Sequence, residues 1–291
     1  MLQAGRFTLL TTFDPAVDVG LNLIGLFDTV AAVADIARGD ISVANEHNSG
    51  VNLYLPPDCA RQVIQLQARD ECRHNFALNS VQRGHRQIVL PGAHSDIGGG
   101  YLPRARERVW LSKPQRINVS KKETVQIHAQ WTLAVERINA LRATGLAGDG
   151  TIEVTAWPIA QAAPGKNDLS GHEPYFLTQV LERTVRGELA LIALRVMREL
   201  GVRHGVPFKD IEALPDLAMP EDLQPIAAQI LDQVMAGNEV SLDPDQERLL
   251  LGRYIHRSAH WTPAGALLVN KPAADNKRKV HPNEPQQGYP Q

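Results

Sequence analysis

Three short apolar segments, each closed by a polar or turn-forming residue, most constrain the fold of this chain. They are residues 21–27 (LNLIGLF), 63–66 (VIQL) and 87–90 (QIVL), and Pro91 and Gly92 follow the third at once. A segment of strand length that is apolar on both faces is typical of a strand buried in a parallel sheet. The sequence therefore predicts the α/β class, with a mostly parallel sheet flanked by helices.

The second half of the chain is predicted to be mainly helical. Apolar residues recur at helical spacing over residues 121–144, 174–200 and 223–235. Ser120 and Glu123 form a capping-box pattern before the first of these segments, and Gly201 follows the second at a common C-cap position. A further helix is expected within residues 70–81, because Asp70 is a favourable first residue.

Charge and composition exclude several classes of protein. The 291 residues include 30 Lys and Arg against 32 Asp and Glu, so no overall field attracts nucleic acid. The hydrophobic share of 43% is enough for a sizeable core. We expect one catalytic unit over residues 1–268 and a disordered tail over residues 269–291, which is rich in Pro, Asn, Lys and Gln. In that tail, Lys277, Arg278 and Lys279 are interpreted as a solvated charge run.

No targeting, membrane or metal-binding signal is found. The first ten residues lack the apolar core of a signal peptide, and the most apolar stretch elsewhere, residues 188–197, is too short and too charged to span a bilayer. Cys59 and Cys72 do not have the spacing of a zinc or redox motif, and the histidines do not have zinc-ligand spacing. We therefore expect a cytoplasmic product without metal or cofactor.

Two candidate catalytic residues follow the predicted strands. Asp28 comes directly after the first apolar segment, and His94 follows the third, in the string IVLPGAHSDIGGGY. Functional groups of α/β proteins gather where loops leave the carboxyl ends of parallel strands. An acid in this position can orient a histidine, and imidazole is well suited to act as a general base.

Each of these residues also has a structural interpretation. Asp28 could be the N-cap of a helix that begins near Thr29, and His94 could be an incidental residue of a surface turn. The order of an acid before a histidine, with a strand-like segment between them, is however that of α/β-hydrolases. His256 and His260, in YIHRSAHW, are alternative bases for which an interior packing role is favoured.

A basic segment around Trp110 is a possible contact surface for lipid. Arg104, Arg106, Arg108 and Lys113 surround this aromatic residue. Contact with phospholipid headgroups is one interpretation, and a simple exposed loop is the favoured one.

Several strings together resemble the Tle-type phospholipase effectors of bacterial type VI secretion. They are GLFDTVAAV, ARDECRHNF and LPGAHSDIGGGY, with LALIALRVMRELGVRHGVPF and YIHRSAHW further on. The resemblance covers roughly residues 21–261 and implies an α/β-hydrolase fold with ester hydrolysis of glycerophospholipids through an acyl-enzyme. It implies that Asp28 is the triad acid and His94 the general base, and it gives Glu71 and Arg73 a structural role.

The nucleophile motif of that family is missing from this sequence. No GxSxG occurs, and the first serine, Ser42, comes after Asp28. We therefore expect a portion of such an enzyme, with its serine on a missing N-terminal part or on an upstream polypeptide, and little hydrolysis by the chain alone.

The resemblance also implies partners and a destination. It predicts export by type VI secretion to the periplasm of a target cell, a phospholipid substrate, and a secretion spike and an immunity protein as partners. The alternative function is a non-catalytic remnant or interaction module that binds a spike, a lipid or an immunity partner.

Overall fold

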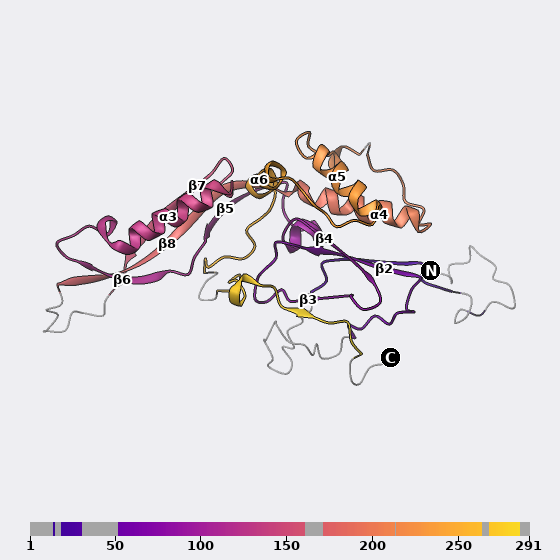
Figure 1. The fold of residues 1–291 in the computed structure, drawn as a ribbon, viewed down its shortest axis with the longest axis horizontal. Coiled ribbons are helices and arrows are strands. Elements are labelled where there is room, and N and C mark those ends of the chain that lie inside the picture. The colour runs from indigo at the N-terminus through magenta and orange to yellow at the C-terminus, as the bar shows by residue number, and fades with distance from the viewer. Residues whose placement is uncertain are drawn as a thin grey trace.

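The fold consists of a body and an arm, as Figure 1 shows. The computed structural model describes residues 14, 19–30, 52–160, 171–212, 214–263 and 268–285. The body holds a small parallel sheet with helices above it. The arm is a long antiparallel sheet with one helix along it.

The body is built on three parallel strands in the order β1-β2-β4. The strands are β1 (Leu23–Phe27), β2 (Gln62–Ala68) and β4 (Arg86–Leu90). Phe27 lies opposite Leu66, and Ala68 lies opposite Leu90, so the carboxyl ends of all three strands meet at one edge. The three strands predicted from the sequence, and their parallel arrangement, are confirmed.

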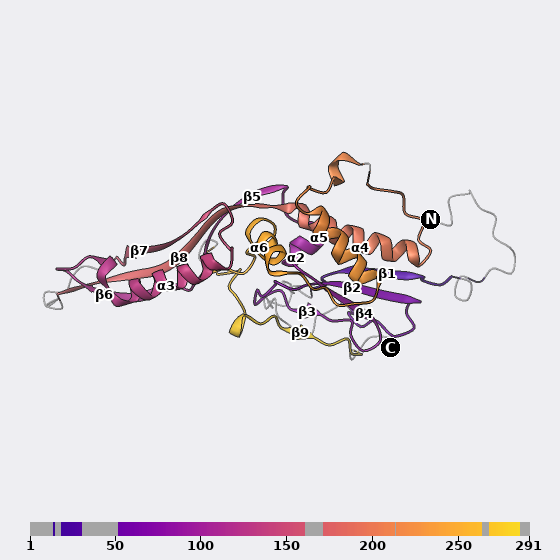
Figure 2. The same cartoon turned by 45° about the horizontal axis from the view of Figure 1, so that its top comes forward.

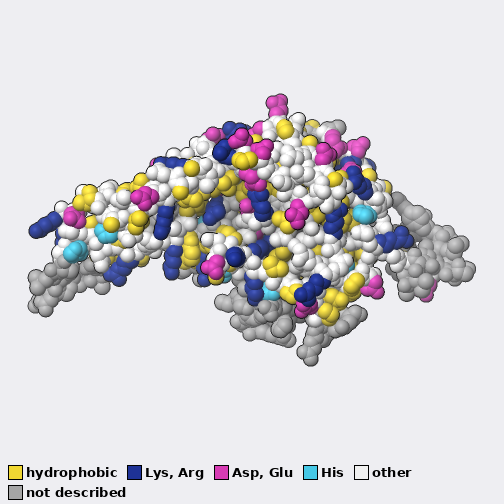
Figure 3. Space-filling model, viewed as in Figure 1, with side chains coloured by type: hydrophobic (Ala, Val, Ile, Leu, Met, Phe, Trp, Pro, Cys, Tyr) yellow, Lys and Arg dark blue, Asp and Glu magenta, His cyan; other side chains and the backbone are white. Residues whose placement is uncertain are grey.

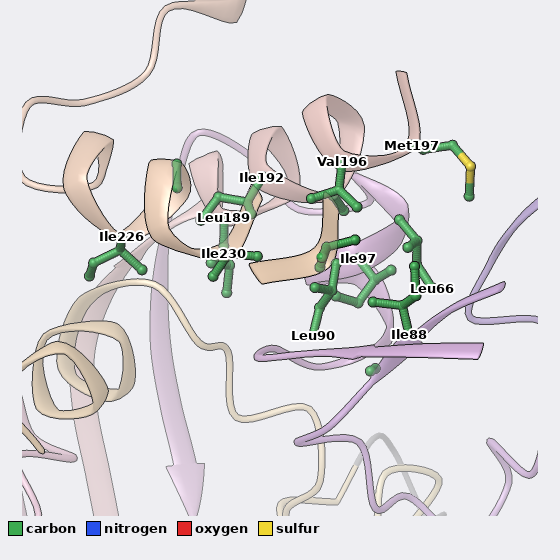
Figure 4. Packing of buried hydrophobic residues seen from close by; sticks show 14 of the residues in the cluster. Leu66, Ile88, Leu90, Ile97, Leu189, Ile192, Val196, Met197, Ile226 and Ile230 are labelled. Atoms are coloured by element: carbon green, nitrogen blue, oxygen red, sulfur yellow. The ribbon is translucent and has the colours of Figure 1, made fainter. Parts of the chain in front are cut away.

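Helices cover one face of this sheet (Figure 2). They are α4 (Ala190–Arg203), α5 (Gln224–Met235) and α6 (Pro244–Arg253), and α5 confirms the helix expected at residues 223–235. Leu66 and Leu90 from the sheet pack with Val196 of α4 and Ile230 of α5 in one continuous hydrophobic cluster (Figure 4). Burial of these side chains is the main stabilising contribution in the body.

The arm is a second sheet in which every pairing is antiparallel. Its elements are β5 (Arg104–Trp110), β6 (Gln115–Ser120), α3 (Ala129–Ala143), β7 (Thr151–Pro158) and β8 (His172–Arg186). The long strand β8 pairs with β5, β6 and β7, and α3 packs on β7. The arm therefore differs from the mostly parallel sheet that the sequence predicts.

Arg183 of β8 joins the arm to the helices of the body. Its guanidinium forms an ion pair with Glu107 at 2.9 Å and donates to the carbonyl oxygens of Leu146, Leu251 and Ile255 at 2.6–2.8 Å. The side chain is buried, and these partners use four of the five N–H donors of its guanidinium. Arg183 thus fixes β8 against the end of α6 and the segment that follows.

The helix expected at residues 174–200 is wrong in its first half. This part forms β8, and helix starts only with the 3-10 turn Gly187–Leu189 and α4. Gly201 lies inside α4, whose C-cap is His204. The cause is that β8 is rich in aromatic and β-branched residues and is paired on both edges, so sheet pairing overrides the helical spacing.

The helix expected at residues 121–144 begins later than predicted. Ser120 is the last residue of β6 and does not cap the helix. The helix α3 begins after His128, whose Nδ1 accepts a hydrogen bond from the Gln130 amide at 3.2 Å. A histidine side chain therefore provides the cap that the pattern of Ser120 and Glu123 assigned to a serine.

The helix expected within residues 70–81 is wrong, because this segment pairs with part of the C-terminal tail. The strand β3 (Leu78–Asn79) lies parallel to β9 (Val280–His281). The His74 amide donates to the Lys271 carbonyl at 3.1 Å, and the Ala273 amide donates to the Cys72 carbonyl at 2.8 Å. Backbone N–H and C=O groups of each segment form hydrogen bonds with the other segment. These groups are therefore not available for the hydrogen bonds of a local helix. Residues 286–291 of the expected tail lie outside the described residues.

The remaining elements are short. They are α2 (His94–Gly98) and the 3-10 turns Val125–Ile127, Pro215–Leu217 and Ala274–Asn276. No helix in the described part of the chain is long and apolar enough to cross a bilayer. Both signs of charge are interspersed on the face in Figure 3, in keeping with the near-zero net charge.

Replacing Leu66 by alanine tests the core between sheet and helices. Leu66 is 0% exposed in the centre of β2, so we expect Leu66→Ala to lower the free energy of unfolding. The expected loss is about 2–5 kcal/mol, because a cavity replaces the isobutyl group. Urea unfolding followed by circular dichroism measures it. The matched control is Leu102→Ala, since Leu102 is 70% exposed. Equal losses in the two variants would contradict this account of the core.

Candidate active site

The candidate site lies at the edge where the three parallel strands end. Asp28 directly follows β1, and its amide donates to the Leu66 carbonyl at 2.7 Å, which extends the pairing of β1 with β2. The Ala68 amide at the end of β2 donates to Asp28 Oδ1 at 2.8 Å. Asp28 has a φ of 47°, a left-handed conformation that aspartate tolerates better than most residues. The turn directs its side chain into the interior, where it is fully buried.

His94 lies against this carboxylate. Its Nδ1 is 2.8 Å from Asp28 Oδ2. Burial of Asp28 acts to raise the pKa of its carboxyl, but hydrogen bonds from His94 and Arg278 and the charge of Arg278 outweigh burial and leave the pKa below its usual value. An ionised carboxylate only accepts, so Nδ1 donates to it, and in a neutral imidazole Nε2 is then the acceptor nitrogen. The His94 side chain is 25% exposed, so part of the imidazole ring is accessible.

A tight turn sets the position of His94 after β4. Gly92 has a φ of 126°, and a Cβ there would lie 2.8 Å from the Cβ of Asp96. Only glycine fits this turn without displacing α2, the helix that begins with His94. The Gly92 amide donates to Asp70 Oδ2 at 2.8 Å, which ties the turn to the end of β2.

Glu71 and Arg73 support the histidine from the segment after β2. Glu71 Oε2 accepts from the His94 amide at 3.2 Å and from Arg73 Nη2 at 2.7 Å. The Arg73 guanidinium lies 3.2 Å from the ring centroid of Phe76, and the Phe76 ring meets His94 edge-on with centroids 5.0 Å apart. Burial raises the pKa of Glu71, but Arg73 outweighs it and keeps the pKa low. The contacts agree with the structural role expected for Glu71 and Arg73.

Arg278 completes the group and was missed by the sequence analysis. Its Nη1 and Nη2 donate to Asp28 Oδ1 and Oδ2 at 2.6 and 2.8 Å, and its Nε donates to the Phe76 carbonyl at 2.7 Å. The side chain is 6% exposed, so the interpretation of Arg278 as solvated is wrong. No local signal identifies it, because its partner lies 250 residues earlier.

His256 forms a second histidine–aspartate pair beside the first. Its Nδ1 lies 2.7 Å from Asp96 Oδ1, and its amide donates to Asp96 Oδ2 at 3.0 Å. The ring stacks on Tyr101 with centroids 3.6 Å apart and is almost completely buried. Burial lowers the pKa of His260, the other alternative base. The burial of His256 agrees with the interior packing role that the sequence analysis favours for it.

Most of the basic segment forms the strand β5 and not a loop, and Lys113 lies between β5 and β6. Arg106 and Arg108 pair with Glu182 of β8. Beside them lies an open hollow of about 630 Å³. Its lining includes Arg104, Arg106, Asp149, Glu182, Arg186 and Arg253, and neither Asp28 nor His94 is among its residues. The hollow is therefore separate from the candidate active site.

The other expectations for this region concern a metal and a helix cap. No cluster of three or more metal-ligating side chains is found among the residues that the structure covers. The alternative interpretation of Asp28 as a helix N-cap depends on residues 31–51, which lie outside the described ranges.

Fold and site together define an α/β protein with a histidine–carboxylate pair at the carboxyl edge of a parallel sheet. Residues 9–133, which include Asp28 and His94, match the catalytic domain of the type VI secretion phospholipase effectors of the Tle1-like kind. The fold is similar to that of the Tle1 effector solved in complex with the VgrG spike of the type 6 secretion system. The TM-score is 0.72 at 26% sequence identity, over 90% of this chain.

The chain thus resembles the Tle-type effectors in both sequence and fold. It spans 58% of the Tle1 chain that it matches. Among curated proteins, none matches it.

Replacing Asp28 by asparagine tests the buried charge group through its pH dependence. The lowered pKa of Asp28 means that its ionised form contributes stability above the unfolded value near 3.8, and that this contribution is lost as the pH falls through the folded-state value. At pH 7 we expect Asp28→Asn to cost about 3–5 kcal/mol, because Arg278 is left buried without its partner charge. The difference from the wild type should shrink as the pH falls below about 4.

Urea unfolding between pH 7 and pH 3 measures this difference. The control is Asp58→Asn, which alters an exposed aspartate. A cost for Asp28→Asn that stays constant over the whole range would contradict the ionised pair.

Proposed function

We propose that this chain provides the acid and the base of a Ser–His–Asp triad that hydrolyses carboxylic esters of glycerophospholipids. The observation that carries the proposal is the 2.8 Å contact between His94 Nδ1 and the buried Asp28 carboxylate, within the part that matches the Tle1-like catalytic domain. The fold proposed for this part is that of an α/β-hydrolase. The chain order of acid before histidine, with each residue following a parallel strand, supports that proposal.

His94 would transfer the proton in both halves of the reaction. Its Nε2 accepts the proton of the serine hydroxyl as the oxygen attacks the ester carbonyl carbon. The same proton passes to the alcohol oxygen that leaves as lysophospholipid, and an acyl-enzyme remains. Water then attacks the acyl group, with His94 again taking and returning a proton. Asp28 orients Nδ1 and stabilises the imidazolium in each step.

The serine of this triad has to come from outside these 291 residues, because they contain no GxSxG. In an α/β-hydrolase the nucleophile follows a strand of the same sheet as the acid and the histidine. Among the described strands β1 is at the end of the order β1-β2-β4, and Phe27 on it is 37% exposed. This supports the proposal that a further strand pairs with β1 and brings the serine next to His94.

The chain alone should therefore show only background hydrolysis. We expect fatty-acid release from phosphatidylethanolamine vesicles once the chain is combined with a polypeptide that carries a GxSxG and is encoded directly before the codon for Met1. His94→Ala should lower that activity about 100- to 10,000-fold, because proton transfer is lost. His204→Ala, at the end of α4, is the matched histidine control. Hydrolysis by the chain alone that is abolished by His94→Ala would overturn the external serine.

A second candidate function is binding to a secretion spike without catalysis. The observation that favours it is the likeness to Tle1, which was solved bound to the VgrG spike. We propose that this chain binds a VgrG spike protein, and that this binding does not depend on the candidate active site.

Size-exclusion chromatography of the chain with the VgrG protein encoded nearest to it tests this binding. The chain should co-elute with VgrG, and His94→Ala should co-elute equally well. Separate elution of the wild-type chain would contradict the second function and leave the first untouched.

A further inference from the structure

Arg278 reaches the candidate site from the opposite end of the chain. Its segment is held beside the site by the pairing of β9 with β3, and by the hydrogen bond from its Nε to the Phe76 carbonyl. The guanidinium meets the carboxylate of Asp28 in a two-pronged contact, and both side chains are buried. A bidentate pair of this kind defines orientation as well as charge.

The hydrogen bonds of Asp28 are shared evenly between its two oxygens. Oδ1 accepts from the Ala68 amide and from Arg278, and Oδ2 accepts from His94 and from Arg278. The carboxylate therefore has little freedom to rotate away from His94. Its negative charge is also matched by a positive one before His94 takes up any proton.

The other charges around His94 follow the same arrangement. Glu71, which accepts from the His94 amide, is paired with Arg73. Asp96, two residues along α2, is occupied by His256 through Nδ1 and the backbone amide. Protonation of His94 would thus add a positive charge close to Arg278 and Arg73. These two arginines already offset the charges of Asp28 and Glu71. With Arg278 removed, the same proton would instead meet the full negative charge of Asp28.

We propose that Arg278 is a positioning residue of the site, which holds the Asp28 carboxylate toward His94 and offsets the negative charge of that carboxylate. This inference rests on the proposed role of His94 as general base. It adds to that role a cation that weakens the pull of the acid on the proton. The C-terminal segment of the chain is thereby part of the catalytic arrangement.

The pH at which His94 titrates is the direct readout. Removal of a positive charge a few ångströms away should move the titration midpoint of His94 up by about one to two pH units in Arg278→Met. Arg278→Lys keeps the charge and should stay within about half a unit of the wild type. Lys277→Met, which removes an exposed charge from the same segment, should leave the midpoint unchanged.

Carbon-13 NMR of histidine-labelled protein follows these titrations, with His94→Gln used to assign the signal. A midpoint that is unmoved or lowered in folded Arg278→Met overturns the proposal, and so does an equal rise in Arg278→Met and Arg278→Lys.

A measurement on the wild type keeps the inference testable if Arg278→Met does not fold. Arg278 and His94 share one carboxylate, so the Nε resonance of Arg278 should shift with the midpoint of His94. An Arg278 signal that stays constant through that titration overturns the proposal.

Neither measurement needs a serine or a substrate, so the result is separable from the proposed function. A raised midpoint without hydrolysis in the combined preparation contradicts the triad alone. Hydrolysis with an unmoved midpoint contradicts the role of Arg278 alone.

Discussion

The buried carboxylate of Asp28 is the group around which the site is organised. A carboxylate removed from water is costly unless its charge is paired and its oxygens accept hydrogen bonds. Here the four donors come from the end of β2, from the first residue of α2 and from the C-terminal segment. The hydrogen bonds of this one carboxylate therefore hold together three parts of the chain that are distant in the sequence. The parallel sheet makes this possible because all of its strands end at the same edge.

The buried acids around His94 all have partners. Asp28 pairs with Arg278 and Glu71 pairs with Arg73, while Asp96 is hydrogen-bonded to His256. Arg278 and Arg73 offset the charges of Asp28 and Glu71, and these contacts hold His94 at a site from which its ring remains partly accessible. The arm is organised in the same way around Arg183, whose buried guanidinium ties β8 to the helices of the body. The site and the arm are thus two places where a buried charge defines a tertiary contact.

Much of the body could be predicted from local sequence signals. The three parallel strands and α5 have apolar patterns strong enough to be recognised, and the position of Asp28 and His94 after two of those strands predicted their proximity. The helix expected over residues 174–200 failed because β8 is stabilised by partners on both of its edges, which no local pattern reports. The segment 70–81 failed for a similar reason, since its backbone groups bond to residues 271–281. The catalytic roles of Asp28 and His94 stay predictions, and so does the location of the nucleophilic serine outside these residues.

What the sequence by itself determined is the α/β class of the body, the pairing of an acid with a histidine and the lack of a GxSxG motif within these residues. These features depend on local composition and on chain order, which a single sequence displays directly. Only the tertiary structure decided that Arg278 is part of the site and that the segment 271–281 is an ordered neighbour of β3. A contact across 250 residues leaves no periodic trace along the chain. The contact forms because the buried Asp28 carboxylate is stable only when a positive charge lies beside it. The sequence does not show that Asp28 is buried, so it could not predict the partner.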